Sequence, residues 1–422
     1  MYELTRLDNG LRILTVSLPY VQSVSLGIFL GVGSRYETAE ISGASHFIEH
    51  MLFKGTRRWP TARDIAEAIE GKGGVFNAST GLETSLFWAK VAAVHLPAAL
   101  DVLSDMLLGA NFDETEMEKE RAVITEEISY IFDSPDSLAQ ILVNRLQWPD
   151  HPLGRDVAGT PETVAKMKRE SLLSFMADHH HPDATILGMA GQISHSDAVA
   201  LADKYLGDWQ PASAAEWEPA PAERDGPRVH VEVKDTEQAH VAFSFAGPSR
   251  QHPDRHAVRM LNVILGEGMR SRLFQEIRER LGLAYTVDSY AATLQDTGTV
   301  SIYAGVAAPR AEETIKAILK QLDQLRQETV SEDELQRTKE FTRGRLSLSL
   351  EDSFTLAAWY TRQQLLGPEV LEPADTMACL DAVQTSDLQR LARSIFREER
   401  LNLAIVGPFS QNGDRFRDII HF

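Results

Sequence analysis

Hydrophobic and polar positions alternate along several short segments of the chain, which is typical of β-strands. In the first half, apolar residues take every second position from 24 to 32, and a second strand segment runs from 85 to 91. In the second half, segments of the same kind lie at 241–245 and 299–306. Longer segments between them carry the spacing of amphipathic helices. Antiparallel strand signals mixed with long amphipathic helices predict an α+β fold.

The order of these elements in the first half recurs in the second half. Each half has a strand, a helical segment, a second strand that is followed by two alanines, and then two helices. The alanine pairs begin at Ala92 and Ala307, which are 215 positions apart. The last helix of each set opens with an acidic turn, at 113–116 and at 331–334, which is favourable at a helix start. The sequence therefore predicts one structural unit that is present twice.

A segment rich in Pro, Ala and Glu separates the two halves at residues 210–227. It lacks apolar periodicity and is interpreted as a linker. We therefore expect an N-terminal domain over 1–209 and a homologous C-terminal domain over 228–422. Each domain is predicted to be a mostly antiparallel sheet packed against helices.

Composition and charge narrow the classes of partner. The net charge of −19 argues against nucleic acid and anionic membranes, which need a basic surface. No apolar run approaches the roughly 20 residues that cross a bilayer, and the N-terminal segment lacks the pattern of a signal peptide. The single cysteine, Cys379, excludes an internal disulfide and a cysteine-built zinc site. We therefore expect a cytoplasmic protein without a membrane partner.

Residues 46–50 read His-Phe-Ile-Glu-His and carry the strongest chemical signal. On a helix, His46, Glu49 and His50 fall within an arc of about 100°, opposite the apolar neighbours. Two imidazoles at positions i and i+4 can bind one zinc ion, which keeps a position for water in catalytic sites. Glu49 lies on the same face and is predicted to be the general base for that water. The alternative is a solvated polar helix face without a metal.

A tetrahedral zinc site needs one more protein ligand from a second element. In the helix after 113, Glu120 and Glu127 share a stripe with Ile124 and Ile131, which predicts that both carboxylates face inward, whereas Glu126 lies off the stripe. A buried charge needs a partner. We therefore expect Glu127 to be the third zinc ligand and Glu120 to orient an imidazole. The alternative is that both are surface residues of a charge-rich helix.

The second half offers a comparison, because it lacks every proposed zinc group. The matching positions hold Leu261, Ile264 and Leu265 in the helix, and Arg345 in place of Glu127. The shared fold therefore does not require the polar set, which favours a function for it in the first half.

Several motifs, taken together, resemble the insulinase or pitrilysin family of zinc peptidases, whose His-x-x-Glu-His order is the inverzincin motif. The resemblance covers nearly the whole chain and is greatest to the short branch with mitochondrial processing peptidase and its bacterial relatives. The motifs lie at residues 7–12, 31–37, 46–56, 76–78, 120–127, 159–163 and 271–285.

The resemblance implies roles for particular residues. His46, His50 and Glu127 correspond to the ligands of one Zn²⁺ per chain, and Glu49 to the catalytic base. Asn77 and Ala78 match the edge segment that pairs with the substrate backbone as an added strand; the residues alone are equally compatible with an ordinary hairpin.

Arg278 and Tyr285 match a pair in the second domain that closes over the scissile peptide, where Tyr can donate to an oxyanion and Arg can hold a carbonyl. From the residues alone, this segment is a plain amphipathic helix. The family also implies a pairing of two chains into a clamshell, as a homodimer or a heterodimer with a homologous chain.

The expected function is that of a zinc-dependent metalloendopeptidase for short or unfolded peptides. The alternative is a non-catalytic or partner-dependent subunit of a heterodimeric processing peptidase. Three consecutive histidines at 179–181 suggest a second metal site, but side chains at consecutive helix positions cannot converge. We expect them to form a structural turn before a strand at 184–190.

Overall fold

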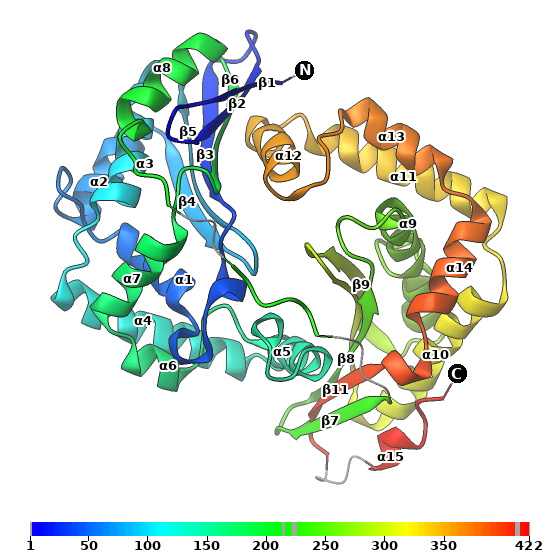
Figure 1. The fold of residues 1–422 in the computed structure, drawn as a ribbon. Helices are drawn as coiled ribbons and strands as arrows, with labels where there is room; N and C mark the ends of the chain where they lie inside the picture. Colours follow the sequence, from blue (N-terminus) through cyan, green and yellow to red (C-terminus); the bar gives the residue numbers. More distant parts are fainter. Residues whose placement is uncertain (1, 213–215, 222–225, 410–413, 422) are drawn as a thin grey trace. The chain divides into compact units, whose positions relative to one another are not determined.

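The computed structural model describes residues 2–212, 216–221, 226–409 and 414–421. Its chain forms two compact units, each with one sheet and a set of helices (Figure 1). Unit 1 consists of Met1–Ile128, Asp156–Glu218 and Ser347–Glu372, and unit 2 of Ser129–Arg155, Pro219–Leu346 and Pro373–Phe422. The predicted α+β class, with a mostly antiparallel sheet in each half, is confirmed.

Among the described residues, the sheet of unit 1 has six strands, and only the pair β2 and β6 is parallel. In the order of the sheet they are β1 (Glu3–Arg6), β2 (Arg12–Ser17), β6 (Thr185–Gly191), β3 (Ser23–Leu30), β5 (Ser85–Ala92) and β4 (Val75–Thr80). The helices of this unit are α1 (Ala44–Leu52), α2 (Ala62–Ile69), α3 (Leu96–Gly109), most of α4 (Glu114–Asp133), α6 (Pro161–Lys166), α7 (Arg169–His179), α8 (His195–Leu206) and α12 (Ser353–Leu366).

In the described part of unit 2 the sheet has five strands, and only β7 and β11 are parallel. In the order of the sheet they are β7 (Arg228–Val233), β11 (Asn402–Gly407), β8 (Gln238–Gly247), β10 (Gly298–Ala307) and β9 (Ala284–Thr293). Its helices are α5 (Pro135–Gln147), α9 (Arg255–Leu265), the π-helix Phe274–Arg280, α10 (Ala311–Gln327), most of α11 (Glu332–Ser349), α13 (Pro373–Ala382), α14 (Thr385–Ile395) and α15 (Asp414–Arg417).

Short 3₁₀ turns connect several of these elements. They are Ser34–Tyr36, Ala39–Ile41, Glu70–Lys72, Ala93–His95, Pro152–Gly154, Ala308–Arg310 and Glu398–Arg400.

Strand register supports the predicted duplication. Leu26 pairs with Ala89 in unit 1, and Val241 pairs with Ala304 in unit 2, so both partners are displaced by 215 positions. In α4 and α11 the buried residues also match, at a displacement of 218. They are Met117, Glu120, Ile124 and Ile128 in α4, and Leu335, Thr338, Thr342 and Leu346 in α11.

One helix of each half belongs to the unit of the other half. Ala357 and Tyr360 of α12 pack with Leu14 and Ile186 of the unit 1 sheet, and α5 packs in the same way on β8 and β11 of unit 2. Gly188 of β6 permits a close approach of α12, because a Cβ there would lie 2.1 Å from Thr361 Oγ1. The units are thus discontinuous in sequence.

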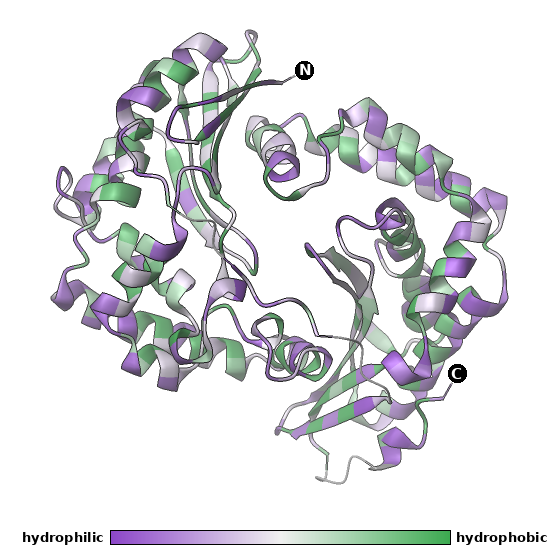
Figure 2. Cartoon of the chain, viewed as in Figure 1, coloured by the Kyte–Doolittle hydropathy of each residue, from purple (hydrophilic) through white to green (hydrophobic). Residues whose placement is uncertain are grey.

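The predicted linker has no helix or strand among its described residues, and positions 213–215 and 222–225 of it lie outside the described residues. The division into domains at 209 and 228 stays a prediction. Hydrophobic and hydrophilic residues are interspersed along the helices of both units (Figure 2). Within the described ranges, no helix combines the length and the apolar character that a membrane span needs.

Candidate metal centre

The start of α1 is fixed by a carboxylate from outside the helix. Glu37 is 3% exposed, and its two oxygens accept hydrogen bonds from Gly43 N and Ser45 N, each at 2.7 Å. A carboxylate at this position accepts hydrogen bonds from amide groups that have no partner within the helix. Its negative charge also interacts favourably with the positive end of the helix dipole. Gly43 has φ = 97°, and a Cβ there would lie 2.6 Å from Ala158 O, so only glycine fits.

The two faces of α1 separate as the sequence predicts. The apolar face, formed by Phe47, Ile48, Met51 and Leu52, is buried. The side chains of His46 and His50 are 19% and 15% exposed, and they stand on the other face. The helix therefore holds both imidazoles rigidly while leaving them accessible.

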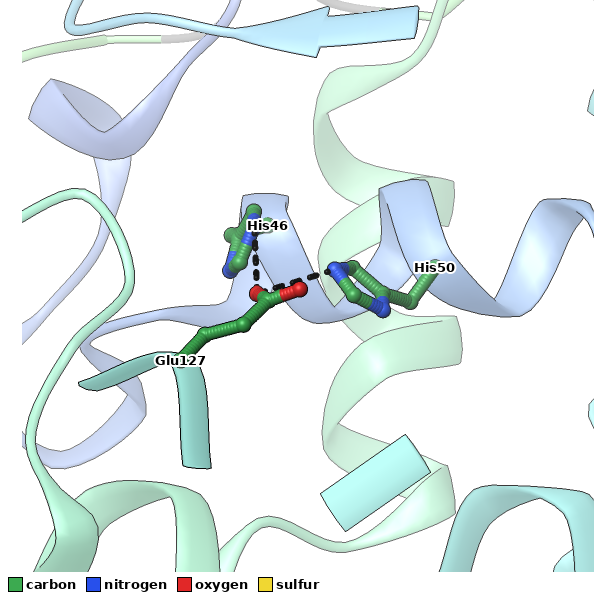
Figure 3. Close-up of side chains that lie close together, drawn as sticks. All are labelled: His46, His50 and Glu127. Atoms are coloured by element: carbon green, nitrogen blue, oxygen red, sulfur yellow. Dashed lines mark ion pairs between the residues drawn. The ribbon is translucent and has the colours of Figure 1, made fainter. Parts of the chain in front are cut away.

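The carboxylate of Glu127 reaches both imidazoles from α4 (Figure 3). Its Oε2 lies 3.7 Å from His46 Nε2 and 3.5 Å from His50 Nε2, and one ligand atom of each residue lies within 4.8 Å of the others. Ligands about 2.1 Å from a tetrahedral zinc are about 3.4 Å apart, so these separations fit a shared cation. The set of two nitrogens and one oxygen is also typical of catalytic zinc.

Glu127 differs from the sequence prediction in one respect. We expected it to face inward on a stripe that continues to Ile131, but its side chain is 45% exposed. The buried stripe of α4 continues instead to Ile128. Seven residues make slightly less than two full turns, so the stripe drifts around the helix axis and leaves Glu127 at its rim.

His50 is held by a chain of two charged groups. Its Nδ1 lies 2.9 Å from Glu120 Oε2, and Glu120 Oε1 lies 2.7 Å from Lys54 Nζ. Glu120 is 4% exposed, so its charge needs these partners. A proton on Nδ1 leaves Nε2 with a free electron pair toward Glu127 and the other imidazole.

His46 is kept in the neutral form. Burial, and secondarily the nearby His50, lower the pKa of His46 to about 4. Neutral imidazole is the form that binds a metal ion, so this histidine needs no deprotonation near pH 7.

Glu49 lies between the two histidines in sequence and contacts the edge strand. Thr80 Oγ1 donates a hydrogen bond of 2.5 Å to Glu49 Oε2. Burial raises the pKa of Glu49, and the bond from Thr80 opposes that rise. A carboxylate whose pKa is raised toward neutrality is a better proton acceptor in catalysis.

Asn77 and Ala78 lie on β4, which is the outermost strand of the unit 1 sheet. Asn77 Oδ1 accepts a hydrogen bond of 2.8 Å from the backbone N–H of Ala78. Because β4 ends the strand order of this sheet, its outer edge can accept another strand.

Arg278 and Tyr285 lie together in unit 2. The Arg278 guanidinium carbon is 4.9 Å from the ring centroid of Tyr285 and 4.8 Å from that of Phe274. Tyr285 is 75% exposed, so its hydroxyl is open to a ligand. A role of Arg278 and Tyr285 in catalysis stays a prediction.

The positions in unit 2 that match the metal centre carry no ligand groups. Leu261, Ile264 and Leu265 are at most 3% exposed and belong to the hydrophobic core of that unit, while Arg345 is exposed. The histidines at 179–181 occupy the end of α7 and the turn before β6, as expected. They do not gather around one point, since His179 contacts Phe175 and Tyr36 while His181 Nε2 bonds to Asp178 O.

The sequence analysis did not predict a role in the site for three residues, which are Glu37, Lys54 and Thr80. A signal existed for Lys54, which lies four positions after His50 and so on the same helical face. Thr80 follows Asn77 and Ala78 in the edge strand, but its contact with α1 depends on the tertiary fold.

Comparison with known proteins agrees with this geometry. The family model described as Insulinase (Peptidase family M16) matches residues 12–161, and the model described as Peptidase M16 inactive domain matches 166–341. The chain is 37% identical over 405 residues to an uncharacterized zinc protease of Bacillus subtilis (strain 168), covering 95% of this chain and 97% of the relative. It is 35% identical over 423 residues to an uncharacterized zinc protease of Streptomyces coelicolor, covering 99% and 92%.

Solved structures share the fold. The crystal structure of a protease from Helicobacter pylori has a TM-score of 0.92 at 24% identity, over 97% of this chain and 100% of the other. A Pseudomonas fluorescens structure titled as a peptidase M16 inactive domain has a TM-score of 0.91 at 19% identity, over 97% and 98%. With both halves matched by family models and relatives aligned over nearly its full length, the chain belongs to the insulinase family, peptidase family M16.

Proposed function

We propose that this protein is a zinc-dependent metalloendopeptidase. His46, His50 and Glu127 hold one zinc ion, and Glu49 is the general base. The observation that carries the proposal is the spacing of three ligand atoms from two helices, at 3.5 and 3.7 Å from Glu127 Oε2 to the two Nε2 atoms. The zinc proteases among its relatives support the choice of metal.

The chain's own residues supply the proton transfers of peptide hydrolysis. When bound, zinc polarises the peptide carbonyl and lowers the pKa of a water molecule. Glu49 accepts a proton from the attacking water and delivers it to the amine that leaves when the C–N bond breaks. Thr80 fixes one oxygen of Glu49, which leaves the other oxygen for the water. Glu120 keeps the Nδ1 proton of His50 in place.

Substrate contacts follow from the edge strand and the aromatic pair. A short or unfolded peptide adds to β4 beside Asn77 and Ala78 as an extended strand. Arg278 and Tyr285 act on the substrate carbonyl from the second domain of a partner chain, in a homodimer or a heterodimer of homologous chains. A single cysteine supports a reducing compartment, and we place the protein in the cytoplasm.

The test is cleavage of a quenched fluorescent peptide by the purified protein at known oligomeric mass. We expect activity that a chelator abolishes and added zinc restores. Glu49→Gln is expected to lower kcat about 100-fold or more while one zinc per chain stays bound.

The matched control is Glu126→Gln, because Glu126 is exposed and lies beside the ligand Glu127. Full activity of Glu49→Gln would end the proposal. Activity that arises only after a second homologous chain is added would instead identify a partner-dependent subunit.

A further inference from the structure

The pair of elements that carries the metal centre in unit 1 has a counterpart in unit 2. There α9 takes the place of α1, and β9 takes the place of β4, since Val287 pairs with Ala304 as Phe76 pairs with Ala89. The helix α9 lies beside β9 (Figure 1), and Asn262 near its end bonds to Ser289 of this strand. A Cβ on Gly266 would lie 2.4 Å from Ser289 N, so a side chain at this position would separate the helix from the strand.

A cavity of about 470 Å³ lies between α9 and β9. This volume is within the range of small-ligand sites, roughly 300–1,000 Å³. The helix contributes a stripe at steps of four and three, and the strand contributes alternate residues that share one face. These residues are Arg255, Arg259 and Asn262 of α9 and Ser289, Ala291 and Thr293 of β9, and Val258, Glu267 and Tyr290 complete the lining.

The polar groups of this cavity are built into the fold. Asn262 is 8% exposed, and its Oδ1 accepts a hydrogen bond of 2.8 Å from Ser289 Oγ. With its oxygen engaged in this way, the Asn262 amide presents its N–H groups as donors. The exposed guanidinium of Arg259 stands one turn before it on the same face of α9.

The charges of the lining favour an anion. Two arginines line the cavity, and Glu267 is the one acidic group among the described residues that form it. Guanidinium groups bind carboxylates in a bidentate fashion. The chain as a whole carries a net charge of −19 and therefore repels anions. The arginines of this cavity offset that repulsion for an anionic group of a ligand.

Nothing supports a catalytic role for this cavity, because the positions that match His46, Glu49 and His50 are buried leucine and isoleucine. We propose that the α9–β9 cavity is a non-catalytic binding site for a carboxylate of the peptide substrate, held by Arg259 and the Asn262 amide. The choice of a peptide rests on the proposed function. The carboxylate belongs either to the peptide C-terminus or to an Asp or Glu side chain.

The test measures binding without turnover, by fluorescence anisotropy on the full chain with the Glu49→Gln substitution. Three ten-residue peptides carry the same neutral fluorophore at the N-terminus. The first has a free C-terminal carboxylate, the second has an amide C-terminus and one central Glu, and the third has an amide C-terminus and no acidic residue. We expect one of the first two to bind about tenfold more tightly than the third, as for one charge-assisted contact.

Arg259→Ala is expected to remove this difference, while Arg337→Ala, which deletes an exposed arginine of α11 in the same unit, preserves it. The peptide that loses affinity identifies the source of the carboxylate. Equal binding of all three peptides would overturn the inference, and so would equal losses in both arginine variants. This experiment measures binding and not cleavage, so equal binding of all three peptides would not contradict the peptidase proposal. Conversely, if the protein cleaves no peptide but still binds a carboxylate-bearing peptide more tightly, this inference holds.

Discussion

The imidazole of His50 illustrates how single residues prepare the proposed zinc site. Its Nδ1 faces the buried Glu120, whose second oxygen is held by Lys54. This arrangement selects the tautomer whose Nε2 can bind a metal ion. It also gives the buried Glu120 carboxylate a partner on each oxygen, in place of the water that it loses on burial.

We predict that Glu120→Gln lowers zinc affinity about 10- to 100-fold, the usual effect of removing a partner of a ligating histidine. An amide can still accept a bond from His50, but it carries no charge and leaves Lys54 without its anionic partner. Competition with a chromophoric chelator measures the affinity. The exposed Glu126→Gln is the control, and a zinc affinity of Glu120→Gln equal to that of the control would contradict the prediction.

The residues predicted from sequence are those whose neighbours lie one helical turn away. His46 and His50 share a face because of helix geometry alone, and α1 has that geometry. Glu127 shows the limit, since its exposure depends on how the stripe of α4 drifts over two turns. Glu37 and Thr80 reach α1 from separate segments, and such contacts require the tertiary fold.

At the scale of elements, the rigidity of α1 depends on its first turn. Both oxygens of Glu37 are used by Gly43 N and Ser45 N, and His46 follows directly. Fraying of this turn would displace one of the two imidazoles relative to the other.

We therefore predict that Glu37→Ala costs about 2–6 kcal/mol of unfolding free energy, because it leaves two buried N–H groups without acceptors at about 1–3 kcal/mol each, and that it also weakens zinc binding. Urea denaturation and chelator competition measure the two effects. Thr61→Ala removes the cap of α2, a helix without metal ligands; it should cost about 1 kcal/mol and leave zinc affinity unchanged. A parallel loss of zinc affinity in both variants would show that general destabilisation, and not the α1 cap, is responsible.

The assignment of helices to sheets was the part of the fold that the pattern did not predict. The spacing of apolar residues reveals that a helix has a buried face, but it does not reveal which sheet covers that face. In β3, Ser25 bonds to Ser353 of α12 and Phe29 packs against Ala358. The face of β3 that carries Ser25 and Phe29 is therefore covered by a helix more than 300 positions later in the sequence.

At the scale of the whole molecule, the duplication makes each unit a control for the other. The two units share strand register and the buried stripe of the acidic helix, but all three proposed zinc ligands lie in unit 1. A ligand that binds only the folded form stabilises the part of the structure that must be intact to bind it.

We predict that zinc protects the amides of α1 and α4 against hydrogen exchange and leaves those of α9 and α11 unchanged. At free zinc of 100 times Kd the added stability is about 2.7 kcal/mol, which would slow exchange through opening of these helices about 100-fold. Mass spectrometry of peptic fragments, with and without a chelator, measures this in one sample. Equal protection of both helix pairs would show that the metal stabilises unit 2 as well as unit 1. Absence of protection in α1 and α4 would contradict the assignment of the zinc ligands.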